Sequence, residues 1–258
     1  MKRFVLSSLA LSLILTGCTT TLPIVEDTHV HDHHHDWDYE HPEKWGDEEV
    51  NKLCSAGQEQ SPIDIKQALR VEPTSDKDIK LTENYQAQDF TVKNNGHTIV
   101  FDVANQSKSQ IVVNGTTYDL LQFHYHIPSE HTVMNTHYPL EIHFVHKSQQ
   151  GNLAVVGVLF NTGKHNDPLQ QIITGLPNEG ENGTLSNFNI GSLMPKDSNA
   201  YAYNGSLTTP PCLEKVQWLL KADPVDASGA QLRTLAKLYD GNNRPVQPPG
   251  DRQIILTK

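Results

Sequence analysis

The chain has 258 residues, of which 36% are hydrophobic and 19% charged, and its formal net charge is −10 at pH 7. This length permits one large core, and because no internal repeat or long linker divides the sequence, we expect one folded domain. The negative charge argues against a protein that binds nucleic acid through its phosphates.

The N-terminus has the pattern of an export signal. Two basic residues precede the apolar run Phe4 to Leu15, which is too short to cross a bilayer as a helix. The tetrapeptide Leu15-Thr16-Gly17-Cys18 resembles a bacterial lipoprotein box, so we predict that residues 1–17 are removed and that Cys18 is lipidated. Thr19 favours the outer membrane, at its periplasmic face. An ordinary signal peptide cut a few residues later, which leaves the protein free in the periplasm, is the alternative.

Residues 18–36 are rich in Thr, Asp and His and lack apolar periodicity. We therefore predict a flexible tether that joins the anchor to a catalytic domain over residues 37–258. Six histidines lie between His29 and His41. A solvated spacer explains them, and a weak zinc-collecting arm is the alternative, because histidine-rich tracts bind metal.

Three cysteines occur in the chain. Lipidation of Cys18 leaves Cys54 and Cys212, an even pair in an oxidising compartment, so we predict a disulfide between them. Two buried free thiols are the alternative, because the sequence does not show whether the two Cα atoms approach within about 7 Å.

From Trp37 onward the chain is predicted to be mostly strand. Two Asn-Gly dipeptides, at Asn95-Gly96 and Asn114-Gly115, are hairpin signals. The strands that they join are predicted over residues 89–94 and 97–104, and over residues 110–113 and 117–121.

Three histidines follow in a pattern that predicts a metal site. His124 and His126 are two residues apart, so in a strand they share a face at a spacing of about 6.7 Å. The connection from Pro128 to Pro139 lets the chain return antiparallel and bring His143 beside them. Three neutral imidazoles suit Zn²⁺ and leave a fourth position for water, as in catalytic zinc sites. Ordinary half-buried strand histidines are the alternative.

Gln122 and Glu141 lie two residues before His124 and His143, on the same strand faces. A zinc-bound histidine donates its second ring N–H to an acceptor that fixes its tautomer and orientation. We therefore predict that Gln122 and Glu141 are these acceptors. A solvent-facing Glu141 is the alternative, since an unpaired buried carboxylate is costly.

The rest of the chain predicts one further buried strand and few, short helices. The strand is the apolar run Leu153 to Phe160. One helix is predicted from Asp167-Pro168 to Leu176, and another from Ser228, carrying Leu232, Leu235 and Leu238. The proline-rich run of residues 244–249 is predicted to lie along the surface.

Seven motifs occur in an order that matches one known family. They are QSPIDI (60–65), NNGH (94–97), QFHYH (122–126), SEHTV (129–133), EIHFVH (141–146), GSLTTPP (205–211) and NRPVQ (243–247). On these motifs the chain resembles the α-class carbonic anhydrases from about Trp37 to Ile255. The resemblance implies a mainly β single domain on a large, mostly antiparallel twisted sheet, with a few short helices and zinc at the base of a conical cavity.

The resemblance also implies an activity, the zinc-dependent reversible hydration of carbon dioxide to bicarbonate and a proton. Zinc lowers the pKa of its bound water to about 7, for which carbonic anhydrase is itself the reference example, so that zinc-bound hydroxide attacks CO2 at neutral pH. A side activity on activated esters is expected.

The same resemblance assigns roles to individual residues. Thr208 orients the nucleophile and donates a hydrogen bond to ionised Glu130, and His97 carries the proton out. Tyr39 and Asn95 order the intervening water. The chain departs from the family at Val100, where Asn or Gln is common, and at Asn243, where animal members have Trp.

An apolar wall for CO2 is also implied, because CO2 offers no group for hydrogen-bond recognition. It comprises Val145, Val155, Leu207, Val216 and Trp218, and Thr209 is expected to contact bicarbonate. Packing in the core is the alternative for these strand side chains.

Two other functions stay open. One is a catalytically silent member of the same fold that acts as a binding module, although such proteins usually lose a zinc ligand. The other is a periplasmic zinc-binding lipoprotein, which would not explain Glu130 or Thr208. The lack of a His-Glu-x-x-His motif disfavours a zinc peptidase. As partners we expect CO2 or bicarbonate, no nucleic acid, a membrane only through the lipid anchor, and at most a second copy in a homodimer.

Overall fold

The computed structural model describes residues 37–70, 78–178 and 181–257. The predicted signal peptide, Cys18 and the tether lie outside these residues. Trp37–Lys258 form one compact unit. Within the described ranges, no helix is both long and apolar enough to cross a membrane.

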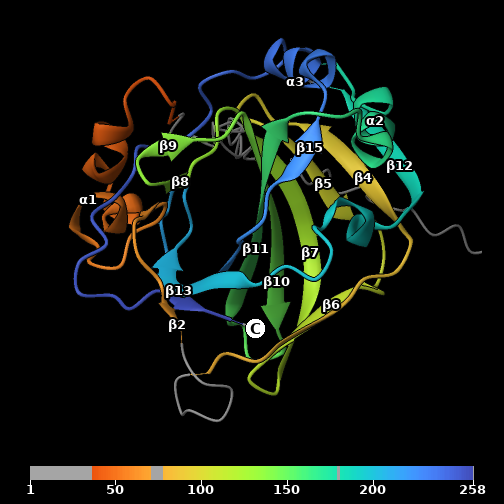
Figure 1. Ribbon diagram of the computed structural model, residues 1–258. Coiled ribbons are helices and arrows are strands. Elements are labelled where there is room, and N and C mark those ends of the chain that lie inside the picture. Colours follow the sequence, from red (N-terminus) through yellow and green to blue (C-terminus); the bar gives the residue numbers. More distant parts are fainter. Residues whose placement is uncertain (1–36, 71–77, 179–180, 258) are drawn as a thin grey trace, which may run out of the picture. The chain divides into compact units, whose positions relative to one another are not determined.

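A thirteen-stranded sheet dominates the part of the chain that the structure describes (Figure 1). Its main path runs in the order β12 (Asn182–Phe188), β4 (Gln88–Asn94), β5 (Ile99–Val103), β7 (Thr116–His126), β10 (Leu140–Ser148), β11 (Leu153–Thr162), β14 (Glu214–Lys221), β13 (Ala200–Ser206), β16 (Ile255–Leu256) and β2 (Leu69–Arg70). Three further strands pair at its sides: β3 (Leu81–Asn84), β6 (Gln110–Val113) and β15 (Val225–Ala227).

Most neighbouring strands of this sheet are antiparallel, but β11 runs parallel to β14 and β15, and β16 runs parallel to β2. A second, three-stranded sheet contains β1 (Asp64–Ile65), β8 (Thr132–Val133) and β9 (Thr136–His137). The predicted mainly β fold on a large twisted sheet is confirmed, with parallel pairing inside it as an addition.

Both predicted Asn-Gly turns join antiparallel strands, β4 to β5 and β6 to β7. Asn114 and Gly115 have φ angles of 49° and 83°, so both central residues have the positive φ that a type I′ turn requires. The second strand of that hairpin continues well past the predicted end at Leu121, because β7 runs on to His126 and includes both histidines of the motif.

Helices are short and have clear local signals. They are η1 (Pro42–Asp47), η2 (Glu49–Asn51), α1 (Leu53–Ala56), α2 (Asp167–Thr174), η3 (Ile190–Leu193) and α3 (Gly229–Ala236). The Asn166 side chain caps α2, and Ser228 and Gln231 form a capping box at α3. α2 ends at Thr174, two residues before the predicted Leu176, and Gly175 is its C-cap. Leu238 lies beyond α3 and is exposed.

Two apolar clusters stabilise the sheet. The larger contains Phe90, Phe123 and Phe144 from the strands, together with Leu169 of α2 and Leu235 of α3, so these helices cover one face of the sheet. The smaller lies under the opposite face and is built around Trp218. Period-two alternation along β7 and β10 therefore divides their side chains between two environments.

The predicted disulfide between Cys54 and Cys212 is present, with the two Cα atoms 5.0 Å apart. It ties α1 to the segment that precedes β14. The C-terminal run of residues 244–249 contains no helix or strand. Its first residue is not on the surface as predicted: Arg244 is buried, because its guanidinium donates to the Gln60 side chain and to the carbonyls of Ser61 and Cys54.

Candidate active site

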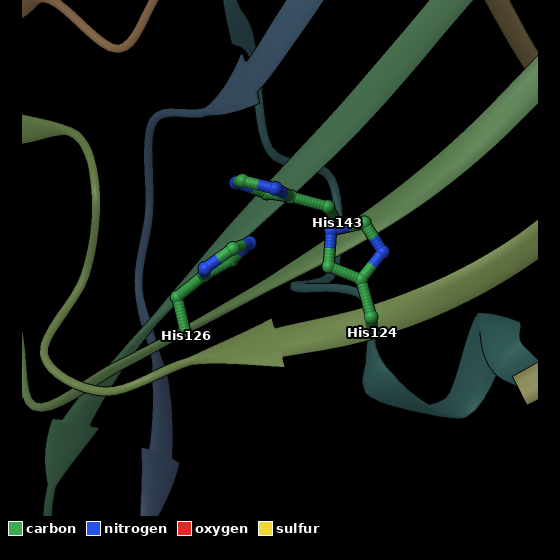
Figure 2. Close-up of side chains that lie close together, drawn as sticks. All are labelled: His124, His126 and His143. Atoms are coloured by element: carbon green, nitrogen blue, oxygen red, sulfur yellow. The ribbon is translucent and has the colours of Figure 1, made fainter. Parts of the chain in front are cut away.

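The three histidines of the motif converge on one point (Figure 2). β7 and β10 are antiparallel, and His143 lies directly opposite His124 in the ladder. One ring nitrogen of each of His124, His126 and His143 lies within 4.8 Å of the other two. The ring centroids are 4.6 to 5.3 Å apart. Strand alternation and register together thus bring the three imidazoles into reach of one ion.

Each ring is oriented by an acceptor on its outer side. His124 Nδ1 lies 2.8 Å from Gln122 Oε1, and His143 Nε2 lies 2.8 Å from Glu141 Oε1. Both contacts are those predicted. His126 Nδ1 lies 2.6 Å from the backbone carbonyl of Asn242. Since these nitrogens are engaged, Nε2 of His124, Nε2 of His126 and Nδ1 of His143 are the ones left to bind a metal.

The residues present fit Zn²⁺. His126 Nε2 is buried and has no hydrogen-bond partner in the structure, as expected for a nitrogen whose partner is a metal. Burial and the neighbouring His126 and His143 lower the pKa of His124 well below its ordinary value, and burial lowers the pKa of His126. Burial also acts to lower the pKa of His143, but Glu141 outweighs it, so that the pKa of His143 is raised. Neutral imidazole is the form that coordinates zinc.

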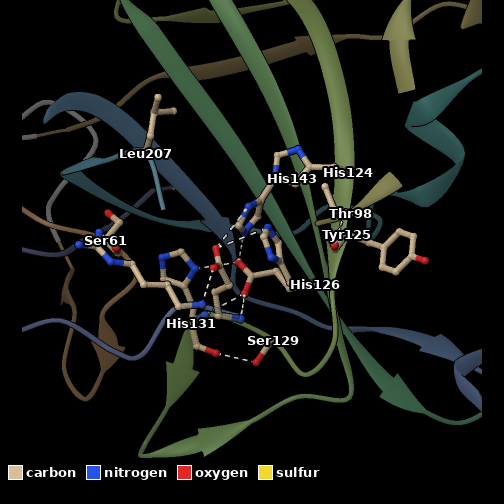
Figure 3. Close-up of polar contacts among 12 residues, drawn as sticks. Ser61, Thr98, His124, Tyr125, His126, Ser129, His131, His143 and Leu207 are labelled. Carbon is tan, nitrogen blue, oxygen red and sulfur yellow. Dashed lines mark hydrogen bonds and ion pairs between the residues drawn. The ribbon is translucent and has the colours of Figure 1, made fainter. Parts of the chain in front are cut away.

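Glu141 accepts four hydrogen bonds, and Figure 3 shows two of its donors, His131 and His143, among the polar contacts of the site. Its Oε1 accepts from His143 and from His131 Nδ1 at 2.7 Å, and its Oε2 accepts from the backbone N–H groups of Glu130 and His131 at 2.9 Å. Burial alone would raise the pKa of Glu141, but His131 and His143 lower it well below its usual range. An ionised, fully bonded Glu141 fixes the ring of His143.

His131 extends this network away from the metal ligands. Its Nε2 lies 2.7 Å from the Tyr203 hydroxyl, which lies 2.9 Å from Ser61 Oγ. The imidazole is completely buried. His131 thus connects Glu141 to β13 and to the segment before β1.

Glu130 is fully buried beside the three rings. Its Oε1 accepts from the Arg244 backbone N–H at 2.8 Å. Its Oε2 has no hydrogen-bond partner and lies 3.5 Å from His126 Nε2 and 3.8 Å from His143 Nδ1. The predicted hydrogen bond from Thr208 is therefore not formed in the structure, because this free oxygen faces the imidazoles.

An apolar cavity of about 240 Å³ lies on one side of the histidines. Val145, Val155, Leu207, Thr208, Thr209 and Trp218 line it, as do Leu121 and Leu153. Val216 does not line it: its side chain is 1% exposed and packs in the cluster around Trp218, behind the wall. Leu121 was not predicted; the β-bulge in the β7–β10 pairing places it next to Gln122 on the cavity side.

A second cavity of about 160 Å³ lies on the other side of His124. Trp37, Tyr39, Asn95, His97, Thr98 and Val100 line it. The rings of Trp37 and His97 are stacked, with centroids 4.0 Å apart. The Tyr39 hydroxyl is buried, and burial together with the charge of Glu130 raises its pKa well above the ordinary value.

The Asn95 side chain, which was predicted to order water, also forms hydrogen bonds with the backbone of its own turn. Its Oδ1 accepts from the N–H groups of His97 at 3.0 Å and Thr98 at 2.8 Å. Only its amide N–H groups are therefore available to water. The side chain fixes the turn that carries His97.

Sequence reasoning missed three parts of the site: His131, the Asn242 carbonyl and the Arg244 N–H. His131 belongs to the motif SEHTV, which also contains Glu130, and this was the one available signal. Asn242 and Arg244 contact residues that precede them by more than 100 positions. Nothing local in the sequence indicates such contacts.

The sheet and the site define a mainly β protein with three convergent histidines that could hold a metal ion, between an apolar and a more polar cavity. The family model for eukaryotic-type carbonic anhydrase matches residues 40–258. A carbonic anhydrase from Neisseria gonorrhoeae is 38% identical over 251 residues, which cover 95% of each chain. One from Klebsiella pneumoniae is 37% identical over 226 residues, covering 85% of this chain and 90% of the relative.

A solved structure of a hyperthermostable carbonic anhydrase, identified from an active hydrothermal vent chimney, superposes with a TM-score of 0.80 at 39% identity. The match covers 86% of this chain and 100% of that one. The chain therefore belongs to the α carbonic anhydrase family.

Proposed function

We propose that the protein catalyses the zinc-dependent, reversible hydration of carbon dioxide to bicarbonate and a proton. The observation that carries this proposal is the convergence of three oriented imidazoles beside an apolar cavity. Membership of the α carbonic anhydrase family supports it. A silent binding module is less well supported, because all three ligand histidines are present with their acceptors.

His124, His126 and His143 would hold the zinc ion. When bound, zinc acts as a Lewis acid that makes a water molecule nucleophilic at neutral pH. The protein's own contribution is orientation: Gln122, Glu141 and the Asn242 carbonyl hold the rings so that one nitrogen of each faces the ion.

The apolar cavity is the proposed CO2 site. CO2 has no group that donates a hydrogen bond and only weak acceptors, so an apolar wall can bind it without the desolvation of polar groups. Val145, Leu207 and Trp218 provide this surface next to His143. Thr209 lines both cavities, which supports the proposal that it contacts bicarbonate.

Glu130 and Thr208 are proposed to orient the attacking oxygen. Glu130 is held by the Arg244 N–H and keeps one free oxygen beside the ligand rings. An ionised carboxylate only accepts hydrogen bonds, so the Thr208 hydroxyl would donate to it and accept from the nucleophile. This role requires a hydrogen bond from the Thr208 hydroxyl to Glu130 Oε2, an oxygen that has no hydrogen-bond partner in the structure.

His97 is the proposed proton acceptor on the polar side. It shares a cavity with His124 and is partly exposed, so it can exchange protons with solvent. Tyr39 and Asn95 line the same space. Val100 adds an apolar side chain there, which reduces the number of groups that can order water between the two histidines.

The test is a stopped-flow assay of CO2 hydration on purified protein whose zinc content has been measured. We expect one zinc per chain and hydration far above the uncatalysed rate. Full zinc occupancy without hydration would contradict the proposal and favour the silent binding module.

We also propose export and anchoring through a lipidated Cys18, on the basis of the apolar leader and the tetrapeptide that ends in this cysteine. Cys18→Ser should move active enzyme to the soluble fraction, because the proposed catalytic residues all lie beyond Trp37. Mass spectrometry should find an acylated cysteine as the first residue. A different mature N-terminus would contradict anchoring and leave the zinc chemistry unaffected.

A further inference from the structure

The segment of residues 239–244, between α3 and the C-terminal run, contacts three separate parts of the site. The Tyr239 hydroxyl donates to Asn94 Oδ1, at the end of β4. Asn242 contacts the end of β7, and the Arg244 N–H donates to Glu130. One short stretch of chain therefore supports the His97 turn, a metal ligand and the buried carboxylate.

Asn242 lies at the centre of this segment, and its backbone carbonyl and both polar atoms of its side chain contact the site. Its backbone carbonyl accepts from His126 Nδ1. Its Oδ1 accepts from the Ile127 N–H at 2.8 Å, and its Nδ2 donates to the carbonyls of Tyr125 at 3.0 Å and His97 at 3.4 Å. The side chain is 3% exposed.

These contacts join two sites that are far apart in the sequence. His126 is the last residue of β7 and Ile127 follows it, whereas His97 belongs to the turn between β4 and β5. The 3.4 Å contact from Asn242 Nδ2 to the His97 carbonyl is a weak hydrogen bond. A second contact supports the same turn: the Tyr125 carbonyl, which accepts from Asn242 Nδ2, also accepts from Thr98 Oγ1 at 2.9 Å. The His97 turn is thus tied to β7 through two neighbouring donors.

Only a side-chain amide satisfies these partners. Ile127 requires an acceptor, whereas the Tyr125 and His97 carbonyls require a donor, and asparagine offers both. Aspartate keeps the acceptor but places a second oxygen against two carbonyls. The His126 contact uses the backbone carbonyl of Asn242, whose position depends on the side-chain contacts to Ile127 and Tyr125.

We propose that Asn242 is a positioning residue that couples the metal ligand His126 to the turn that carries His97. Its side chain fixes the separation between the metal centre and the proton acceptor. This inference rests on the proposed function for its kinetic consequence, whereas the coupling itself is a property of the fold.

The experiment compares Asn242→Asp with Asn166→Asp in the zinc-loaded protein. Asn166 is an equally suitable control, because it is buried, accepts from the Leu169 N–H and donates to the Asp226 carbonyl, away from the site. For Asn242→Asp we expect about tenfold faster zinc release to a chelator, at the low end of the effect of outer-sphere partners. We also expect several-fold lower turnover in weak buffer, restored by added imidazole, with kcat/KM largely kept.

The double variant His97→Ala/Asn242→Asp separates positioning from general damage. If Asn242 acts through His97, the double variant loses no more weak-buffer turnover than His97→Ala alone. Additive losses, or equal effects of Asn242→Asp and Asn166→Asp on zinc release and turnover, would overturn the proposal.

The wild type provides a test that needs no variant to fold. Removal of zinc should shift the NMR signals of the Asn242 side-chain amide and of the His97 backbone N–H, while those of Asn166 stay unchanged. Unshifted Asn242 and His97 signals would contradict the coupling. Zinc release and NMR shifts do not depend on turnover. A wild type that fails to hydrate CO2 would therefore contradict the proposed function, and these two measurements would still test the coupling.

Discussion

The two faces of β7 and β10 bury side chains of opposite character. Phe123 and Phe144 point into the apolar cluster under α2 and α3, whereas His124 and His143, one residue along each strand, point to the metal centre. On the site face the ligand rings have orienting acceptors. On the core face His146 is completely buried, and neither of its ring nitrogens has a hydrogen-bond partner.

The difference shows how one sheet serves stability and chemistry at once. Alternation separates the two tasks by a single residue, so the core face supplies burial energy and the site face can hold polar groups whose desolvation is offset by fixed hydrogen bonds. Changes on one face should therefore affect zinc and turnover, and changes on the other should affect unfolding.

The largest effect is expected on the site face, from His126→Ala. Two remaining imidazoles hold zinc poorly, so zinc content should fall and CO2 hydration should drop at least ~1000-fold, since the nucleophile depends on the ion. Atomic absorption and stopped-flow assays measure both. The far-UV spectrum should stay that of the wild type; retained zinc with wild-type turnover would contradict the assigned ligand set.

On the core face of the same strand, Phe123→Ala should act on stability. The ring is 1% exposed and stacks on Phe101, with centroids 4.3 Å apart. Its removal leaves a cavity that costs about 3–5 kcal/mol of unfolding free energy. Denaturant titration measures this loss, and the folded variant should still bind one zinc. Loss of zinc from a Phe123→Ala variant whose stability is unchanged would contradict the proposal that the core face affects unfolding and the site face affects zinc binding.

His146 makes the core face sensitive to acid. Burial lowers its pKa to about 3, whereas an unfolded histidine titrates near 6.5. Between these values the unfolded chain binds more protons, so the stability contribution is lost as pH falls from about 6.5 toward 3, by about 2 kcal/mol at pH 5. His146→Leu should lose that much less stability than the wild type between pH 7.5 and 5.

Unfolding curves of both proteins at the two pH values test this prediction. The metal ligands titrate alike in the two proteins, so the difference between them reports His146. Identical pH dependence would show that His146 is not the acid-sensitive group of the core.

The smallest effect is expected beside the site face, from His97→Ala. If His97 accepts the proton, turnover in weak buffer should fall about tenfold, because general acid–base transfer is lost while the apolar cavity is unchanged. An imidazole buffer should restore most of the loss. Equal turnover of the two proteins in weak buffer would assign proton export to another group.

Local patterns were sufficient to predict a chain that is mostly strand and the convergence of the three histidines, whereas the single large sheet was implied by the family resemblance. His124 and His126 share a face because a strand has a period of two, and the spacing to His143 allowed an antiparallel return. Gln122 and Glu141 followed from the same alternation. The Asn-Gly turns followed from the backbone angles that these residues tolerate.

Other features depend on contacts that no local pattern indicates. The Asn242 carbonyl reaches His126 across 116 residues, and the Arg244 N–H reaches Glu130 across 114. The bulge that brings Leu121 to the cavity is a property of strand pairing. The family resemblance assigned Val216 to the wall, but Val216 packs in the cluster around Trp218 and does not line the apolar cavity.

Titration of zinc into chelator-stripped protein, followed by CO2 hydration, tests the central claim most directly. The account predicts that activity rises in proportion to bound zinc and reaches its maximum at one ion per chain, with the His126→Ala variant inactive throughout. Hydration that is independent of zinc, or none when one ion per chain is bound, would contradict it.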